Sequence, residues 1–174
     1  MRQLSLWRDG LAMHHQIEHK GSDHRSEFLS VRLATQEFAI DIKSIREIRG
    51  WIASTHLPFA PPFIKGMINL RGSVLIVIDL AQRLGLTAVE LDAGSVVVVV
   101  ECGDRTVGLL VDAVCDIITV TDDMRQNTPE TGSDVPKSFI EELVMMDNRI
   151  ISILYLPTLI PEEKIQKMAE LQAV

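Results

Sequence analysis

Two charged side chains, Glu47 and Arg71, stand out as candidates for a recognition site. Glu47 follows Lys43 by four residues, which is the spacing of a weak surface ion pair on a helix. Arg71 precedes Gly72 at an expected bend between two strands. By residue type alone each is an ordinary solvated charge, because isolated surface charges are common. The alternative is that both take part in binding a partner.

The N-terminal region carries most of the imidazole groups that could bind a metal: His14, His15, His19 and His24. His15 and His19 are four residues apart and could chelate a metal on one face of a helix. The alternative is a polar tail with incidental histidines, and the absence of supporting residues around them favours it. Cys102 and Cys115 lack metal-ligand spacing and are expected to be packing residues. We expect no metal and no other cofactor.

The sequence contains no recognisable catalytic arrangement. It lacks the G-x-S-x-G motif of serine hydrolases, and it lacks a glycine-rich loop that could hold phosphate groups. The Gly-Ser pairs at residues 72–73 and 94–95 are typical of turns. Asp122 and Asp123 lie at an expected loop or helix start, where water would solvate them. These features predict a protein that is not an enzyme.

Composition indicates an ordinary folded protein of 174 residues, with 47% hydrophobic and 24% charged residues. Its hydrophobic residues are mainly Val, Ile and Leu, which favour strands. The net charge of −7 argues against nucleic acid as a partner, because phosphate binding needs clustered Lys and Arg. No apolar run approaches the length needed to cross a bilayer, and no secretory signal is evident. We therefore expect a cytoplasmic protein without direct membrane insertion.

Short alternating or apolar segments predict a mainly β protein. Residues 71–72 and Asp147-Asn148 are expected to be tight hairpin turns. The expected strands are residues 29–33, 38–42, 67–70, 74–78, 95–102, 106–111, 117–120, 143–146 and 150–154.

A few short helices are expected between these strands. Asp41 could cap a helix running to Arg49. On that helix Ile45 and Ile48 would share one face with Ile42, whereas Glu47 would point almost the other way. Another short helix is expected after Asp79, and a longer one is expected at residues 161–171.

The two halves of the chain resemble each other. Residues 38–42 match 107–111, and Ile45-x-x-Ile48 matches Val114-x-x-Ile117, both at an offset of 69 residues. Residues 74–80 match 150–156 at an offset of 76 residues. Each half reads as strand, hairpin, short connection, hairpin and short helix, an order that suits a small closed barrel. We therefore predict two packed five-stranded barrels followed by a C-terminal helix.

The expected domain organisation follows from this repeat. Residues 1–26 form a flexible tail, residues 27–160 form one domain, and residues 161–174 contain the C-terminal helix. Within the domain, the barrels are expected at about residues 27–86 and 87–160. The matching aliphatic residues of the repeat are either core residues or part of a contact surface: Ile45, Ile48, Val114 and Ile117.

Three stretches of the sequence strongly resemble the CheW-type chemotaxis coupling proteins. These are E-I-R-G at residues 47–50, F-I-K-G-M-I-N-L-R-G at residues 63–72 and I-D-L at residues 78–80. The similarity continues through residues 107–112 and 116–117, and covers about residues 27–160. It implies two SH3-like barrels, in agreement with the repeat.

The resemblance also implies a function as an adaptor. Such a protein joins the cytoplasmic tips of methyl-accepting chemoreceptors to the regulatory domain of a CheA-type histidine kinase, in receptor arrays at the inner face of the membrane. By position, Glu47 and Arg71 correspond to the family's charged pair near the partner-binding surface. Ile45, Val114 and Ile117 correspond to apolar positions that line a receptor groove between the barrels.

The chain departs from the family pattern at Ile76, where a proline is usual, and in residues 127–136. These departures bear on the identity of the partner more than on the fold. An adaptor of a non-motility chemosensory pathway is therefore an alternative. A β-barrel that senses a small molecule and an unrecognised hydrolase are alternatives of other classes.

Overall fold

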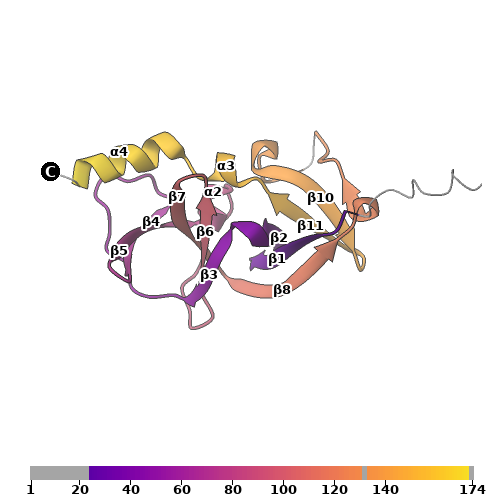
Figure 1. Ribbon diagram of the computed structural model, residues 1–174, viewed down its shortest axis with the longest axis horizontal. Coiled ribbons are helices and arrows are strands. Elements are labelled where there is room, and N and C mark those ends of the chain that lie inside the picture. The colour runs from indigo at the N-terminus through magenta and orange to yellow at the C-terminus, as the bar shows by residue number, and fades with distance from the viewer. Residues whose placement is uncertain (1–23, 131–132, 173–174) are drawn as a thin grey trace, which may run out of the picture.

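The computed structural model describes residues 24–130 and 133–172 (Figure 1). The protein is mainly β and consists of two SH3-like barrels packed together, with short helices and a longer C-terminal helix, which confirms the predicted fold class. Residues 1–23 of the expected N-terminal tail lie outside the described residues. Ser26, the last residue of that expected tail, already begins the first strand.

Barrel 1 is a five-stranded sheet with the order β3-β6-β7-β5-β4. Neighbouring strands are antiparallel except for β5 and β7, which are parallel. Its strands are β3 (Ile45–Gly50), β4 (Ile64–Leu70), β5 (Ser73–Asp79), β6 (Val96–Cys102) and β7 (Arg105–Val111).

Barrel 2 is a six-stranded sheet with the order β8-β1-β2-β11-β10-β9, in which β11 and β2 are parallel. One edge strand, β9, has only two residues, so five strands form the body of this barrel. The strands are β1 (Ser26–Leu33), β2 (Gln36–Asp41), β8 (Ala113–Val120), β9 (Arg125–Gln126), β10 (Ile140–Met146) and β11 (Arg149–Leu154).

Short helices connect the strands, and aspartate side chains cap the starts of η1 and α2. The Asp79 carboxylate is fully buried, yet it accepts hydrogen bonds from the backbone N–H groups of Gln82 and Val89, each at 3.0 Å. The helices are η1 (Ile42–Ser44), α2 (Leu80–Arg83), η2 (Asp122–Met124), η3 (Lys137–Phe139), α3 (Leu156–Leu159) and α4 (Glu162–Gln172).

The expected division of the barrels near residue 86 is wrong. Each barrel takes strands from both halves of the chain: barrel 1 contains the β6–β7 hairpin of the second half, and barrel 2 contains the β1–β2 hairpin of the first half. The repeat correctly matches β2 with β7, β3 with β8 and β5 with β11. The first hairpin of each half, however, belongs to the barrel that contains the remaining strands of the other half. A hydrophobic pattern does not reveal which strands will pair in this way.

This exchange buries both faces of the central strands. Phe38 and Ile40 of β2 belong to a large apolar cluster that includes residues of both barrels, whereas Ala39 between them faces a smaller cluster inside barrel 2. All three side chains are at most 1% exposed. Burying a Phe or Ile side chain contributes about 1.5–3 kcal/mol. The shared cluster therefore holds the two barrels together as one folded unit.

The close packing inside barrel 1 predicts that Gly108 cannot be enlarged without cost. A Cβ atom at Gly108 would lie 2.7 Å from Val97 Cγ1 and 3.4 Å from atoms of Leu75 and Val77. We expect Gly108→Ala to lower the free energy of unfolding by about 1–3 kcal/mol, measured by urea denaturation. Gly50→Ala is the matched control, because a Cβ there meets nothing within 4 Å. Equal stability of the two variants would contradict this account of the packing.

A cross-strand ion pair on the surface of barrel 1 makes a second prediction. Arg46 donates two hydrogen bonds to Glu101, at 2.8 and 2.7 Å, and the hydrogen bonding above all lowers the pKa of the Glu101 carboxyl. In Arg46→Met that pKa should rise toward the ordinary glutamate value of about 4.3, measured by carboxyl NMR titration. Arg32→Met, at an exposed residue of β1, should leave it unchanged.

The sign of the pH dependence follows from the lowered pKa. A carboxyl with a depressed folded-state pKa stabilises the fold above its unfolded pKa and loses this contribution as the pH falls through the folded value. Any stability difference between the wild type and Arg46→Met should therefore shrink on acidification below about pH 4. A difference that grew on acidification would contradict the assignment.

Candidate functional site

The expected helix from Asp41 to Arg49 is wrong beyond its first turn. Asp41 does cap a helix, because its side chain accepts a hydrogen bond from the Lys43 N–H at 2.9 Å. That helix, η1, ends at Ser44, and β3 follows immediately. Ile45 and Ile48 therefore lie on a strand, where a spacing of three residues would normally put them on opposite faces.

A β-bulge in β3 brings these two isoleucines back to one face. Ile45 pairs with Val100 and Ile48 pairs with Val98, so one extra residue of β3 is accommodated between them. Glu47 pairs with Val99. Because successive residues of β6 point to opposite faces, Glu47 lies on the face opposite to Ile45 and Ile48. The helix was expected to put Glu47 on the side opposite to Ile45 and Ile48, and the bulged strand produces the same separation.

The corresponding strand of the repeat, β8, has the same irregularity. Val114 pairs with Val31 of β1 and Ile117 pairs with Leu29, with a register shift between the two pairs. Leu29 and Val31 lie on one face of β1, so Val114 and Ile117 also share a face. The i, i+3 spacing in both halves of the sequence therefore marks two bulged strands.

β3 and β8 are edge strands of their respective sheets and lie at the junction of the barrels in Figure 1. Ile45 and Val114 are half-buried and pack against the shared apolar cluster. Ile48 and Ile117 are 47% and 57% exposed. Each edge thus presents one aliphatic side chain anchored in the core and one in solvent, which together we call the edge aliphatic residues: Ile45, Ile48, Val114 and Ile117.

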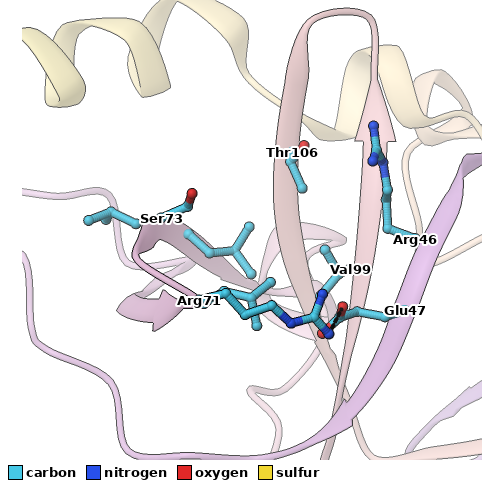
Figure 2. Close-up of a pocket in the computed structure, with 9 residues that line it drawn as sticks. Arg46, Glu47, Arg71, Ser73, Val99 and Thr106 are labelled. Carbon is cyan, nitrogen blue, oxygen red and sulfur yellow. Dashed lines mark ion pairs between the residues drawn. The ribbon is translucent and has the colours of Figure 1, made fainter.

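The opposite face of β3 carries the charged pair. Glu47 Oε2 lies 3.0 Å from Arg71 Nη2, and Glu47 Oε1 lies 3.6 Å from Arg49 Nη1. Figure 2 shows the Arg71 side chain reaching toward Glu47 across the end of barrel 1. Glu47 is mostly covered, with 23% of its side chain exposed, whereas Arg71 is 79% exposed. The structure therefore brings together the two charges singled out in the sequence.

The Glu47–Arg71 pair borders an open cavity of about 350 Å³ in barrel 1. The buried side chains of Leu75 and Val99 contribute to its lining, together with the charged side chains of the pair. A hollow that combines aliphatic walls with charged and polar side chains suits the binding of a side chain of a partner protein. The lining residues are Arg46, Glu47, Leu70, Arg71, Ser73, Val74, Leu75, Val99 and Thr106.

Arg71 is held in an unusual backbone conformation. It and Gly72 form the tight turn between β4 and β5, with φ angles of 51° and 85°, and the Asn69 side chain accepts a hydrogen bond from the Gly72 N–H at 2.9 Å. A left-handed conformation suits Gly or Asn better than Arg, and costs a residue such as Arg about 1 kcal/mol or more. The turn fixes the origin of the Arg71 side chain beside the cavity.

Sequence reasoning missed most of the residues around this site, among them Arg49, Val74 and Thr106. Arg49 is a second partner of Glu47, while Val74, which is 68% exposed, and Thr106 line the cavity. Strand alternation in residues 45–50 would have placed Arg49 beside Glu47, but the segment was interpreted as a helix. Thr106 reaches the site only because the β6–β7 hairpin belongs to barrel 1.

Most of the candidate metal-binding histidines lie near the N-terminus of the chain. His14, His15 and His19 lie outside the described residues, so the structure does not bear on them. Among residues 24–130 and 133–172, no group of three or more His, Cys, Asp or Glu side chains is placed to hold a metal ion. In the same part of the chain, no helix is both long and apolar enough to cross a membrane.

Comparisons with known proteins agree with this architecture. The CheW-like domain family matches residues 27–164. A probable chemotaxis protein CheW from Rhizobium etli is 45% identical over 136 residues, covering 78% of this chain and 88% of the relative. Chemotaxis protein CheW from Rhizobium meliloti is 42% identical over 138 residues, covering 79% and 89%.

Among solved structures, the scaffolding protein TtCheW from Thermoanaerobacter tengcongensis superposes with a TM-score of 0.74 at 29% sequence identity. The match covers 79% of this chain and 94% of that protein. Sequence and structure therefore agree over the same domain, and the chain belongs to the CheW family of chemotaxis proteins.

Proposed function

We propose that this chain is a non-catalytic adaptor of bacterial chemotaxis that couples the signalling tips of chemoreceptors to a CheA-type histidine kinase. The observation that carries the proposal is the division of β3 into two faces. Glu47 lines the charged cavity of barrel 1, and its neighbour Ile48 lies on the opposite face with Ile45, which packs against the shared apolar cluster. One strand thus contributes to two distinct surfaces, as an adaptor requires.

The cavity of barrel 1 is the proposed surface for the regulatory domain of the kinase. Its apolar walls can receive an aliphatic side chain, and the exposed Arg71 guanidinium offers a charge at the rim. An apolar centre surrounded by a polar rim is the usual arrangement of protein interfaces, and Arg is common among the residues that dominate binding. All the residues that line this surface belong to barrel 1.

The edge aliphatic residues are the proposed surface for the receptor tip. They come from both barrels, with β3 contributing two and β8 contributing two. An amphipathic helix binds by laying its apolar face on such a row of aliphatic side chains. Receptor binding would therefore depend on how the barrels are placed relative to each other, whereas kinase binding would not.

This arrangement provides a route for signalling without covalent chemistry. A receptor shift biases the kinase only if the adaptor makes different contacts in the two signalling states. Because Glu47 and Ile48 are adjacent in β3, a displacement of this edge strand would move both surfaces together. The proposed partners place the adaptor in the cytoplasm, recruited to receptor arrays at the inner face of the membrane.

In this proposal the adaptor domain spans residues 27–160, and α4 extends it at the C-terminus. The flexible N-terminal tail stays a prediction. The alternative of a non-motility chemosensory pathway uses the same two surfaces with a different receptor and kinase, so binding to defined partners separates the two pathways.

Charge reversal tests the kinase surface. Glu47→Lys and Arg71→Glu each place like charges next to each other and should weaken binding to the kinase regulatory domain about tenfold or more, measured by titration calorimetry. The double variant Glu47→Lys/Arg71→Glu restores an opposite-charge pair and should recover part of the affinity if the pair itself organises the surface. Circular dichroism and urea denaturation check folding.

The control for charge alone is Glu141→Lys, at an exposed position of β10 in barrel 2. It changes the net charge by the same amount as Glu47→Lys and should leave kinase binding unchanged. Folded Glu47→Lys and Arg71→Glu proteins that bind the kinase domain as tightly as the wild type would refute the assignment of this surface.

Removing the exposed aliphatic side chains tests the receptor surface. Ile48→Ser and Ile117→Ser should each weaken binding to a receptor-tip fragment by about fivefold to thirtyfold, because each loses about 1–2 kcal/mol of buried apolar contact. Their stability should change little, since both side chains are largely exposed already. Ile150→Ser is the matched control, as Ile150 is 58% exposed on β11. Equal losses in all three variants would contradict a specific surface.

A further inference from the structure

Arg83, at the end of α2, makes an unusually dense set of contacts. Its Nε donates a hydrogen bond to the Leu159 carbonyl at 2.8 Å, and its Nη2 donates one to the Thr158 carbonyl at 3.0 Å. Its guanidinium carbon also lies 4.7 Å from the ring centre of Phe63 and 4.8 Å from that of Phe139. We call these five residues the Arg83 clamp.

The Arg83 clamp joins the two barrels. Arg83 follows β5 and Phe63 precedes β4, so both are attached to strands of barrel 1. Phe139 precedes β10, and Thr158 and Leu159 follow β11, so these three are attached to barrel 2. At the offset of the second repeat, Arg83 of α2 corresponds to Leu159 of α3. The clamp therefore ties together the equivalent ends of the two repeated units.

The chemistry of the clamp requires an arginine. The last carbonyls of a helix lack intrahelical partners, and Arg83 donates to two of them at the end of α3. A guanidinium can donate two hydrogen bonds from its planar fork while its faces contact aromatic rings, which a lysine ammonium cannot reproduce. Partial burial lowers the pKa of Arg83, because the guanidinium lies in a partly water-excluded place.

The position of the clamp allows it to affect the geometry of the receptor surface. In Figure 1, α2 and α3 lie on one side of the junction between the barrels, and β3 and β8 lie on the other. Each barrel is a continuous hydrogen-bonded sheet. A change in the angle between the barrels at α2 and α3 would therefore change the separation of the edges that carry Ile48 and Ile117.

We propose that Arg83 is a positioning residue that sets the relative placement of the two barrels and thereby the affinity of the receptor surface. The inference rests on the proposed function, because it assigns a determinant to the receptor surface that spans both barrels. The kinase surface lies wholly within barrel 1, so Arg83 should not affect it. This difference between the two surfaces makes the proposal testable.

The first experiment compares two affinities in Arg83→Lys, which keeps the charge and removes the planar fork. We expect its affinity for a receptor-tip fragment to fall about tenfold, a typical size for coupling between sites. Its affinity for the kinase regulatory domain should stay within about twofold of the wild type, because that surface is confined to barrel 1. Arg32→Lys, the same substitution at an exposed position of β1, should change neither affinity.

The second experiment measures the placement of the barrels without any partner. Nitroxide labels are attached at Asp104→Cys in barrel 1 and Glu141→Cys in barrel 2, both exposed positions, after Cys102 and Cys115 are replaced by alanine. Double electron–electron resonance should show a shifted or broader distance distribution in Arg83→Lys than in the background with Arg83. The Arg32→Lys control should show the distribution of the background.

The outcomes separate failure of the clamp from failure of the proposed function. An unchanged distance distribution overturns the clamp whether or not the wild type binds a receptor tip. If the wild type binds a receptor tip, and Arg83→Lys changes the distance distribution without changing the receptor affinity, the clamp is overturned as well. Equal loss of both affinities, together with lower stability, would indicate a merely structural role and overturns it too. A wild type that binds neither partner refutes the proposed function instead.

Discussion

The pairing register of β3 with β6 is the constraint on which both proposed surfaces depend. The bulge between Ile45 and Glu47 inserts one residue into an otherwise regular antiparallel ladder. With regular alternation Ile45 would share a face with Glu47, and Ile48 would share the other face with Arg46. The bulge instead separates an aliphatic face from a charged one. Because edge strands have a free side, such a bulge can form there without disturbing a second neighbour.

The same constraint operates in barrel 2, where the bulge in β8 places Val114 and Ile117 on one face. The two edges are held to each other by the shared apolar cluster, which exists because the halves of the chain exchange their first hairpins. β1 and β2 consequently have one face in barrel 2 and the other against barrel 1. An adaptor built from two sequential barrels would have only a surface contact between them, and such contacts permit relative motion by default.

Much of the local structure could be predicted from the sequence. The turns at Arg71-Gly72 and Asp147-Asn148 form where they were expected, with positive φ angles that suit Gly, Asp and Asn, and Asp79 caps α2. The segment 45–50 was misread because an i, i+3 spacing of aliphatic residues has two structural causes, a helix and a bulged strand, and periodicity does not separate them. The predicted boundary between the barrels near residue 86 is wrong for a different reason. Strand pairing is a long-range property that local patterns do not encode.

The site shows the same division between local and long-range information. Glu47 and Arg71 could be singled out by type and by family resemblance, but their 3.0 Å contact depends on the closure of barrel 1. Sequence reasoning could not identify Arg83, because its partners in barrel 2 lie far along the chain. These partners are two backbone carbonyls and one aromatic ring. If coupling between receptor and kinase requires two discrete arrangements of the adaptor, the contacts that define them must cross between the barrels. In the described part of the chain, the Arg83 clamp combines charge, hydrogen bonds and ring contacts across that boundary, and these can be broken without emptying the apolar core.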